Sequence, residues 1–381
     1  MRKILFIIPS LSHGGTNRSL QNLISLLDKK TFDIYVLSQQ AEGEYKNTFK
    51  KYNLITPTGL IYYLWNSSSL FMRGLRLFDR EIKGFLSQWI CKKYINKLEK
   101  KYKFDIAIAI KELEATYFTS FFSIKKIAWI HCDYDYYIKS IEPDLILENH
   151  IYEKFNNIIC VSQYTTQTFI KNFPHFRNKV KTIYNSINTQ IIQQLADQTE
   201  TLDPRFQTDA FRIVSIGRID PVKRFDKIPW IIQKAKELGV KKQLKWFIIG
   251  DGKEKHIKEI LRNIQEYNSN NDIILLGSKS NPYPYIKHAD LLISTSLSEA
   301  CPYVIIESEV LHTPILSTNY ESAKEIIAKE NGIISELTEI PYYLSNIINN
   351  KDQLYTDIKK SAELFNYSNN EIIHSVEHLL N

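Results

Sequence analysis

Short apolar runs alternate with amphipathic helical patterns along almost the whole chain, and this alternation restricts the possible folds more than any other feature. Apolar runs separated by helices of about 10–15 residues are typical of parallel sheets that helices cover on both faces. The runs predict strands at 3–9, 33–38, 104–110, 127–131, 157–162 and 180–184, then at 211–217, 244–250, 272–276, 290–295 and 314–317. We therefore expect an α/β protein built on doubly wound parallel sheets.

A polar stretch interrupts this rhythm near the middle, and the length of 381 residues also favours two domains over one. Between the strands, helices are predicted at 226–238, 253–267, 302–311, 321–329 and 369–380, with an earlier one capped by Thr16 or Asn17. The predicted organisation is a first Rossmann-like domain at 1–188, a linker at 189–209, a second Rossmann-like domain at 210–365, and a last helix within 366–381 that can cross back to the first domain.

Composition excludes several other classes of protein. The chain is 44% hydrophobic and 24% charged, which argues against disordered, collagen-like and coiled-coil proteins. No run of about 20 apolar residues is present to span a bilayer, and the apolar run after Met1 is too short for a signal peptide. The four cysteines lie far apart without a C-x-x-C pair, which argues against a zinc site or a disulfide framework and predicts a cytoplasmic location.

One segment, 73–103, contains ten basic and three acidic residues, a net charge equal to the +7 of the whole chain. Aromatic and aliphatic residues recur in it at spacings of three and four, which is typical of a basic amphipathic helix. Such a helix can lie on an anionic membrane, or it can be a core helix with a solvated outer face. Nucleic acid is disfavoured because no recognition motif accompanies the charge. The residues assigned to membrane contact are Arg73, Arg76, Arg80, Lys83, Trp89, Lys92 and Lys93.

Gly14 and Gly15 lie between the first predicted strand and its helix. Paired glycines let a ligand approach the backbone closely, and a helix N-terminus favours an anion. The pattern is neither G-x-G-x-x-G nor a Walker motif, so a standard dinucleotide site or a kinase is disfavoured. The alternative is a tight turn without a ligand.

Two cations, Arg218 and Lys223, follow the first strand of the second block, where a crevice is expected. Arginine suits two-point contact with phosphate oxygens, and lysine acts as a point charge. Fixed cations there can stabilise a diphosphate as it departs and gains charge. The alternative is an exposed basic loop.

A third loop reads Glu299-Ala-Cys-Pro-Tyr-Val-Ile-Ile-Glu307, and Pro302 suits the first position of a helix. One carboxylate before the helix and one in its second turn can accept hydrogen bonds from hydroxyl groups, while the helix start faces an anion. Taken singly, each glutamate is better explained as a solvated helix residue than as a ligand-binding residue. Together with the two cations they fit a ligand made of a sugar, a diphosphate and a ribose.

These residues resemble the retaining glycosyltransferases of family four, which have the GT-B fold of two Rossmann-like domains facing a central cleft. The strongest likeness is the E-x7-E motif of Glu299 and Glu307, supported by Gly217-Arg218 with Lys223 and by the 249–252 turn. The resemblance is strong from about 211 to 332 and looser before that.

The resemblance implies that Arg218, Lys223 and the amides of Gly14 and Gly15 bind the donor phosphates. It implies that Glu299, with Cys301 and Tyr303 beside it, contacts the donor sugar, and that Glu307 contacts the ribose. His131 resembles the family's active-site histidine, with a histidine packed at a strand end as the alternative. Asp133 is a weaker candidate for an acceptor contact. No cofactor and no metal are expected, because the nucleotide sugar is a substrate and no metal-ligand cluster is visible.

The family resemblance also implies the substrates. It favours a UDP-linked hexose or N-acetylhexosamine as donor, and a polyprenyl-diphosphate-linked saccharide of bacterial surface-polysaccharide or capsule assembly as acceptor. The expected location is the inner face of the cell membrane, bound peripherally. Two alternatives are a non-catalytic nucleotide-sugar-binding subunit and a GT-B sugar-nucleotide epimerase.

Departures from the family pattern concern the donor pocket. Ala300 replaces the common glycine, and 185–188 reads Asn-Ser-Ile-Asn in place of Asn-Gly-Ile-Asp. The glycine pair that often follows the 314–317 strand is replaced by 320–323, Tyr-Glu-Ser-Ala. These changes leave the cations and both glutamates in place.

Overall fold

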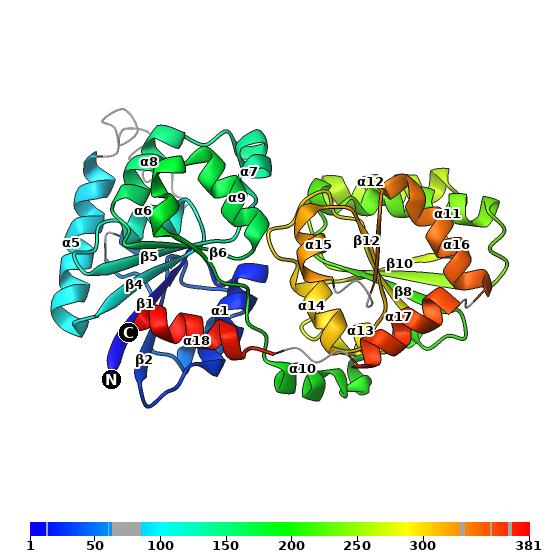
Figure 1. The fold of residues 1–381 in the computed structure, drawn as a ribbon, viewed down its shortest axis with the longest axis horizontal. Helices are drawn as coiled ribbons and strands as arrows, with labels where there is room; N and C mark the ends of the chain where they lie inside the picture. Colours follow the sequence, from blue (N-terminus) through cyan, green and yellow to red (C-terminus); the bar gives the residue numbers. More distant parts are fainter. Residues whose placement is uncertain (13, 60, 63–84, 328–331, 351–352, 365–367) are drawn as a thin grey trace. The chain divides into compact units, whose positions relative to one another are not determined.

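The computed structural model describes the whole chain except residues 13, 60, 63–84, 328–331, 351–352 and 365–367, and the chain divides into two compact units (Figure 1). The first unit comprises Met1–Ser186 and Asn370–Asn381, and the second comprises Ile187–Asn369. Each unit is built on one parallel sheet with helices on both faces, which confirms the predicted fold class.

The first sheet has seven strands in the order β3-β2-β1-β4-β5-β6-β7. The strands are β1 (Arg2–Ile8), β2 (Phe32–Ser38), β3 (Leu54–Ile55), β4 (Ile106–Ile110), β5 (Lys125–Ile130), β6 (Asn157–Cys160) and β7 (Val180–Thr182). Strands β2 and β3 are added on one side of β1, and β4 to β7 are added on the other side, so the strand order reverses between β1 and β4. These two strands pair in parallel, with Ile4 opposite Ile106. Ligands of doubly wound folds bind outside the carboxyl ends of the strands at such a switch point.

The helices of the first unit cover both faces of this sheet, and α5, α6 and α8 lie on the opposite side from α1 and α18 (Figure 1). They are α1 (Gly15–Leu26), α2 (Lys46–Lys50), α5 (Phe85–Tyr102), α6 (Glu114–Thr119), α7 (Tyr134–Ile141), α8 (Leu145–Glu153), α9 (Gln163–Asn172) and α18 (Asn370–Leu380).

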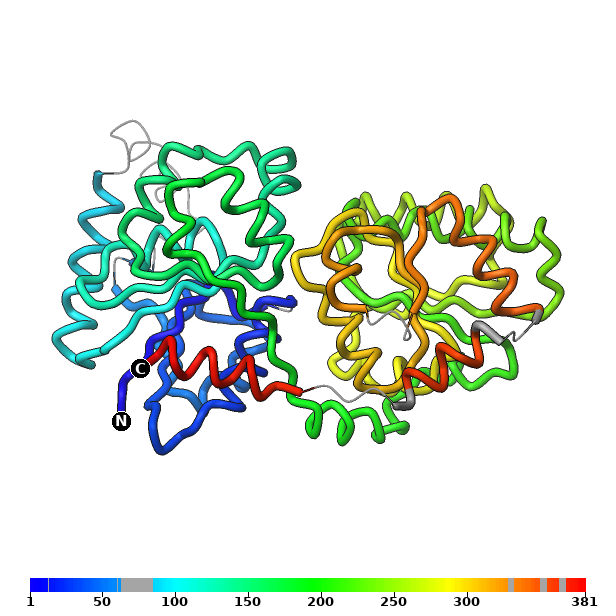
Figure 2. The backbone as a smooth tube through the Cα atoms, in the orientation of Figure 1, coloured from blue at the N-terminus to red at the C-terminus, as the bar shows by residue number. Residues whose placement is uncertain are grey.

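Helix α18 packs on the first unit, where the two chain termini lie close together (Figure 2). Arg2 donates to the carbonyl of Leu380 over 3.0 Å, and Lys125 donates to that of Leu379 over 2.8 Å. Val376 and Leu380 are buried, so the apolar stripe of this helix is covered.

The second sheet has six strands in the order β10-β9-β8-β11-β12-β13. The strands are β8 (Phe211–Ile216), β9 (Leu244–Ile249), β10 (Ile273–Gly277), β11 (Leu291–Ser294), β12 (Ile315–Thr318) and β13 (Gly332–Ser335). Its switch point lies between β8 and β11, where Leu291 pairs with Ile213. The loops that carry the two cations and the first glutamate therefore leave adjacent strands at one edge of the sheet.

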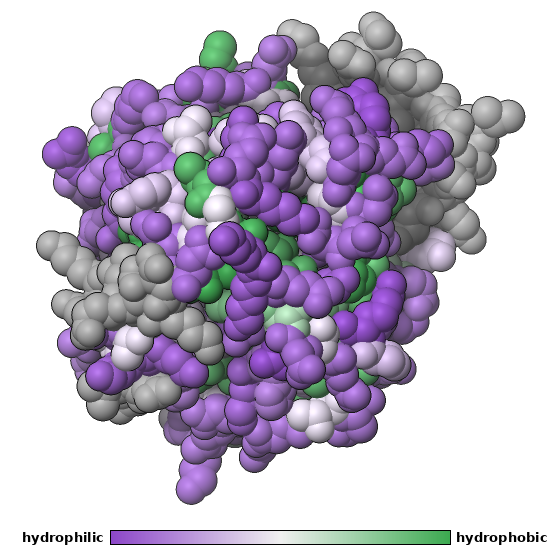
Figure 3. All heavy atoms as spheres, turned by 90° about the vertical axis from the view of Figure 1, so that its right-hand side faces the viewer, coloured by the Kyte–Doolittle hydropathy of each residue, from purple (hydrophilic) through white to green (hydrophobic). Residues whose placement is uncertain are grey.

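Two apolar clusters cover the second sheet. Helices α11, α12 and α16 pack on one face, with Trp246 at the centre of the contact, and α13, α14 and α15 pack on the other, with Phe247. The helices of this unit are α10 (Thr189–Ala196), α11 (Ile228–Glu237), α12 (Glu254–Glu266), α13 (Tyr283–Lys287), α14 (Tyr303–Val310), α15 (Glu321–Ile326), α16 (Ile340–Asn350) and α17 (Gln353–Leu364). The face of the molecule displayed in Figure 3 is largely hydrophilic and shows hydrophobic residues only in small separate areas.

The structure differs from the sequence predictions at several elements. The segment predicted as a linker contains α10, whose Ile192 and Ala196 pack with Ile286 and Ile306, so it belongs to the second unit. Helix α1 begins earlier than predicted, with Gly14 as its N-cap and no side-chain cap. Asn17 instead donates to the carbonyls of Ser10 and Ser12 and braces the preceding loop.

Pro302 is the N-cap residue of α14 and precedes its first helical residue. Strands β3 and β13 were not predicted. Strand β3 has only two residues, and β13 has only one fully buried residue, so neither gives a strong apolar run.

Candidate active site

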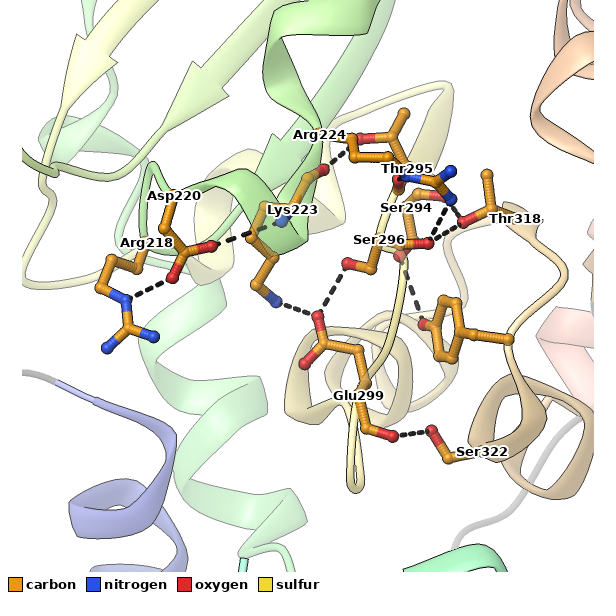
Figure 4. Close-up of polar contacts among 11 residues, drawn as sticks. Arg218, Asp220, Lys223, Arg224, Ser294, Thr295, Ser296, Glu299, Thr318 and Ser322 are labelled. Carbon is orange, nitrogen blue, oxygen red and sulfur yellow. Dashed lines mark hydrogen bonds and ion pairs between the residues drawn. The ribbon is translucent and has the colours of Figure 1, made fainter. Parts of the chain in front are cut away.

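Lys223 and Glu299 form an ion pair at the switch point of the second sheet (Figure 4). Lys223 ends a 3-10 turn after β8, and Glu299 lies in the loop after β11. The side chains are 18% and 17% exposed, so the pair is shielded yet reachable from solvent. Ser296 also donates to the same carboxylate oxygen over 2.7 Å. The two residues that the sequence assigned to donor phosphate and donor sugar are therefore in direct contact.

Glycines make room for this arrangement. A Cβ on Gly217 would lie 2.9 Å from Cε of Lys223, so the lysine stem packs over a position that has no side chain. A Cβ on Gly250 would lie 1.8 Å from the carbonyl oxygen of Gly217. The position of the Lys223 ammonium thus depends on the close backbone packing at the ends of β8 and β9.

Arg218 is placed differently from Lys223. Its guanidinium is 78% exposed and donates from Nε to Asp220 over 2.6 Å, while Asp220 also accepts the Lys223 backbone N–H over 3.3 Å. Figure 4 shows the Arg218 guanidinium on the far side of Asp220 from Glu299. The structure therefore brings Lys223 and Glu299 together and leaves Arg218 as an exposed cation on the same loop.

Arg224 is a residue to which the sequence analysis assigned no role. Its backbone is left-handed, with φ 51°, and its guanidinium donates to the carbonyls of Thr295 over 2.9 Å and Ser296 over 2.8 Å. Burial lowers the pKa of this arginine. In return, Thr295 donates to the Lys223 carbonyl over 2.6 Å, so Arg224 and Thr295 join the two site loops.

The segment after β12 supports the Glu299 loop from its other side. Thr318 donates to the carbonyl of Ser296 over 2.6 Å, and Ser322 donates to the carbonyl of Glu299 over 2.7 Å. Tyr320 is buried beside Ser294, and burial, with a smaller contribution from Glu299, raises its pKa. Of the residues that depart from the family pattern here, Ser322 therefore holds the Glu299 backbone in place.

Glu307 lies in the second turn of α14 and is fully buried. Its Oε1 accepts a hydrogen bond from the Tyr283 hydroxyl over 3.3 Å. Tyr303 is also buried and packs with Tyr283 and Ile306, whereas Cys301 is half-buried and forms no disulfide bond within the described residues.

In the first unit, Gly14 and Gly15 are both exposed at the start of α1. A Cβ on either glycine would meet no atom within 4 Å in the described structure. Internal packing therefore does not explain this glycine pair.

His131 follows β5 and donates its backbone N–H to the buried carboxylate of Glu112. Its ring Nε2 is buried and has no hydrogen-bond partner among the described residues. Burial, and next the Lys111 ammonium, lower the pKa of His131 from 6.5 to about 3, so the imidazole is neutral at physiological pH. The sequence analysis did not identify Glu112.

Asp133 is the N-cap of α7. Its Oδ1 accepts from the Asp135 backbone over 3.0 Å, and its Oδ2 accepts from the Tyr164 hydroxyl over 3.1 Å. These bonds give Asp133 a structural role, and contact with an acceptor remains a prediction without geometric support.

Of the residues assigned to membrane contact, Arg73, Arg76, Arg80 and Lys83 lie outside the described residues. Helix α5 covers the rest of the segment and packs on the core through Ile90, Cys91, Ile95 and Leu98. Phe85 and Trp89 are instead 71% and 51% exposed, beside the exposed Lys92 and Lys93. Nζ of Lys93 lies 5.0 Å from the centre of the Trp89 ring.

Two further features concern the described part of the chain. No helix there is both long and apolar enough to cross a membrane. No group of three or more histidine, cysteine, aspartate or glutamate side chains there is arranged to hold a metal ion.

Two family models match the chain. "Glycosyltransferase Family 4" matches residues 13–191, and "Glycosyl transferases group 1" matches residues 198–364. Together they cover nearly all of both units.

Curated relatives match mainly over part of their length. An uncharacterised glycosyltransferase of Methanocaldococcus jannaschii is 29% identical over 206 residues, 52% of this chain and 48% of the relative. An N-acetylgalactosaminyltransferase of Campylobacter jejuni, whose name specifies a diphospho-undecaprenol-linked substrate, is 29% identical over 49% of this chain and 48% of the relative. The chain thus spans about half the length of these two relatives. The amylovoran biosynthesis glycosyltransferase AmsD of Erwinia amylovora is 20% identical over 88% of this chain and 86% of its own.

Solved structures share the fold along the full chain. HepE of Anabaena, in complex with UDP and glucose, matches with a TM-score of 0.77 and 17% identity, covering 100% of this chain and 99% of its own. TarM of S. aureus, in a complex that contains UDP, matches with a TM-score of 0.73 and 15% identity over 100% of both chains.

Proposed function

The chain belongs to the family-four glycosyltransferases of GT-B fold, and we propose that it transfers a sugar, with retention of configuration, from a nucleotide sugar to a saccharide acceptor. The observation that carries this proposal is the Lys223–Glu299 pair at the switch point of the second sheet. It joins a phosphate-binding cation to a hydroxyl-binding carboxylate where doubly wound folds bind ligands.

The preferred donor is UDP-linked, with a hexose or an N-acetylhexosamine as the transferred sugar. Support comes from HepE, which was solved with UDP-glucose, and from the name of the Campylobacter relative. In the second unit, Lys223 and the exposed Arg218 bind the diphosphate. In the first unit, the amides of Gly14 and Gly15 at the start of α1 are candidates for phosphate contact, because a Cβ on either glycine would meet no atom within 4 Å in the described structure. These fixed cations and amides supply the charge that a divalent ion could otherwise provide, so we propose a metal-independent reaction without a cofactor.

The chemical step breaks the bond between the anomeric carbon and the diphosphate oxygen, and the bonding electrons leave with the diphosphate. The acceptor hydroxyl attacks the same face of the sugar and passes its proton to the departing phosphate. Lys223 and Arg218 stabilise the growing negative charge, because preorganised cations need little rearrangement.

The carboxylates and the histidine orient the donor. Glu299 accepts hydrogen bonds from sugar hydroxyls, and Glu307 accepts them from the ribose once the donor displaces the Tyr283 hydroxyl. The His131 ring near the sugar adds no positive charge to the oxocarbenium-like state, because its lowered pKa keeps it neutral.

We further propose a lipid-linked acceptor in bacterial surface-polysaccharide assembly, at the cytoplasmic face of the membrane. The Campylobacter relative acts on a diphospho-undecaprenol-linked saccharide by its name, and the Erwinia relative serves amylovoran biosynthesis by its name. On this chain, exposed Phe85 and Trp89 accompany the α5 lysines, an apolar and cationic combination that suits an anionic bilayer surface.

The direct test of the function is a donor screen. Candidate UDP-, GDP- and dTDP-sugars are incubated with the protein and a lipid extract, free nucleoside diphosphate is measured, and the anomeric configuration of the product is read by NMR. We expect release from a UDP-sugar and a product with the donor's configuration. Tight donor binding without any release would instead indicate a non-catalytic binding subunit, and an altered sugar on an intact nucleotide would indicate an epimerase.

Membrane binding is tested by sedimentation with phosphatidylglycerol vesicles and with neutral phosphatidylcholine vesicles at low salt. We expect binding to the anionic vesicles only, reduced several-fold in a Phe85→Ser/Trp89→Ser variant. A Lys241→Ser/Lys242→Ser variant of the second unit serves as the control and should bind normally. Equal recovery of the wild type on both vesicle types would contradict the membrane proposal.

A further inference from the structure

Glu112 is a buried carboxylate at the switch point of the first sheet, and the site described above gives it no role. It follows β4, which lies between β1 and β5 in the sheet, and it is 3% exposed. Burial raises the pKa of this carboxyl, so its position is unfavourable unless surrounding groups compensate.

The compensation comes from the segment that contains His131. The Glu112 carboxylate accepts the backbone N–H of His131, and the Lys111 ammonium and the Cys132 thiol beside it also favour its charged form. Burial and Glu112 raise the pKa of the Cys132 thiol, which therefore stays protonated. The His131 N–H is thus held by a group that, when ionised, has only acceptors.

The residues on both sides of Glu112 have positive φ angles, which strain the backbone. Lys111 has φ 110° and Leu113 has φ 61°, both in the left-handed region that side chains disfavour. The Lys111 N–H donates to the carbonyl of Trp129 over 3.1 Å, which fixes this turn to β5. Strained non-glycine residues on both sides of one buried carboxylate indicate that its position is maintained for a purpose.

We propose that Glu112 is a positioning residue for sugar transfer, which holds the backbone of His131 and Cys132 so that the His131 ring is presented to the donor in one orientation. This inference rests on the proposed function of His131. Glu112 itself touches neither substrate. It acts through the peptide of the histidine, and it ties together the carboxyl ends of β4 and β5.

A Glu112→Gln substitution tests this closely, because it keeps the size of the side chain and changes only its hydrogen-bonding pattern. The amide can still accept one N–H, but its own NH₂ group is a donor where the carboxylate has an acceptor. The matched control is Glu148→Gln, since Glu148 is also buried in the first unit but accepts from Tyr134 and Tyr137 and not from His131.

We expect Glu112→Gln to lower kcat by about tenfold to hundredfold with a donor KM within about threefold of wild type, because misplacing a reacting geometry affects the chemical step more than binding. The control should keep kcat within about threefold. Diethyl pyrocarbonate labelling, read by mass spectrometry, gives a measurement that needs no turnover. His131 should resist labelling in wild type and in the control, and should react at least about fivefold faster in Glu112→Gln because its ring becomes mobile.

Unchanged kcat together with unchanged His131 labelling would overturn the proposal. If wild type turns over no donor, the proposed function fails, but the labelling result still decides whether Glu112 holds the histidine. Should Glu112→Gln not fold, Glu112→Asp, which withdraws the carboxylate by one methylene, is put through the same two measurements.

Discussion

At the scale of single residues, His131 shows how the fold decides the charge of a side chain. Its position at the end of β5 buries the ring, and the nearby Lys111 ammonium further disfavours its protonation. The neutral imidazole is therefore a consequence of location, and it is measurable through protein stability.

The folded-state pKa of His131, about 3, lies below its unfolded value of 6.5. Between these values the unfolded chain binds a proton that the folded protein excludes, so the free energy of unfolding falls as the pH drops from 6.5 towards 3. In His131→Gln, we expect the free energy of unfolding to fall by about 2–4 kcal/mol less than in wild type over this pH range. Urea unfolding of both proteins at pH 7 and pH 4 measures it, and parallel pH curves would show that the histidine is not protected.

Gly217 supplies a second prediction at this scale. A Gly217→Ala methyl would lie 2.9 Å from Cε of Lys223 and push the ammonium out of place. We expect donor turnover (kcat/KM) to fall by about tenfold or more, because the proposed role of Lys223 is to bind the diphosphate. Gly239→Ala is the control, since a Cβ there meets no atom within 4 Å. Comparable loss of turnover in both variants would point to general destabilisation.

At the scale of elements, the loop between β11 and α14 determines where Glu299 lies. It is bonded on one side to Arg224 and on the other to Thr318 and Ser322. These contacts come from two other strand–helix connections, β8–α11 and β12–α15, so the glutamate is fixed by the sheet order of the second unit.

Arg224→Gly tests the two guanidinium hydrogen bonds to the Glu299 loop without adding backbone strain. Glycine accepts the φ of 51° without strain, but it removes both guanidinium hydrogen bonds. We expect donor turnover to fall by about tenfold while the free energy of unfolding changes by less than about 2 kcal/mol. Arg205→Ala, which removes an exposed arginine paired with Asp203, is the control and should keep full turnover. Normal turnover in Arg224→Gly would show that the Glu299 loop keeps its position without the Arg224 hydrogen bonds.

Strand positions could be predicted because strands buried on both faces appear as apolar runs, as in 4–8 of β1, where every residue is buried. Local signals were insufficient elsewhere. Gly14 caps α1 without a side chain, and β3 is too short to give a pattern. Helix α10 was taken as part of a linker because its apolar face is covered only by residues about 100 positions later.

The candidate site was predictable as far as its residues belong to local sequence motifs. Lys223 and Glu299 lie in recognisable loops, and adjacent strands bring these loops together. Glu112 could not be identified in this way, because its partner comes from another strand end and nothing in its own segment marks it. Tyr320 lies in a segment noted as a departure from the family pattern, but its contact with Ser294 depends on the fold.

At the scale of the whole molecule, the chain passes between the two units twice, after Ser186 and after Asn369. Asn369 accepts the backbone N–H of Ile187 over 3.0 Å and donates to the Ile187 carbonyl over 2.7 Å. The two crossing segments are thereby joined to each other at the boundary of the second unit.

Asn369→Ala removes both hydrogen bonds at this crossing. We expect the free energy of unfolding to fall by about 1–2 kcal/mol, because a partly buried backbone N–H and carbonyl lose their partner. Asn349→Ala, which removes an exposed bond to the Gly239 carbonyl, should cost less. Equal and small effects in denaturant titrations of both variants would contradict a special role of Asn369.

The account depends most on the contact between Lys223 and Glu299, and the rate of UDP release from the preferred donor tests it most directly. Wild type, Lys223→Ala and Glu299→Gln are compared at saturating acceptor, after circular dichroism has verified that all three are folded. We predict that each substitution slows release by about a hundredfold or more, because each removes a group that we propose contacts the donor at the site of bond cleavage. Release at the wild-type rate by either folded variant would contradict the assignment of this site.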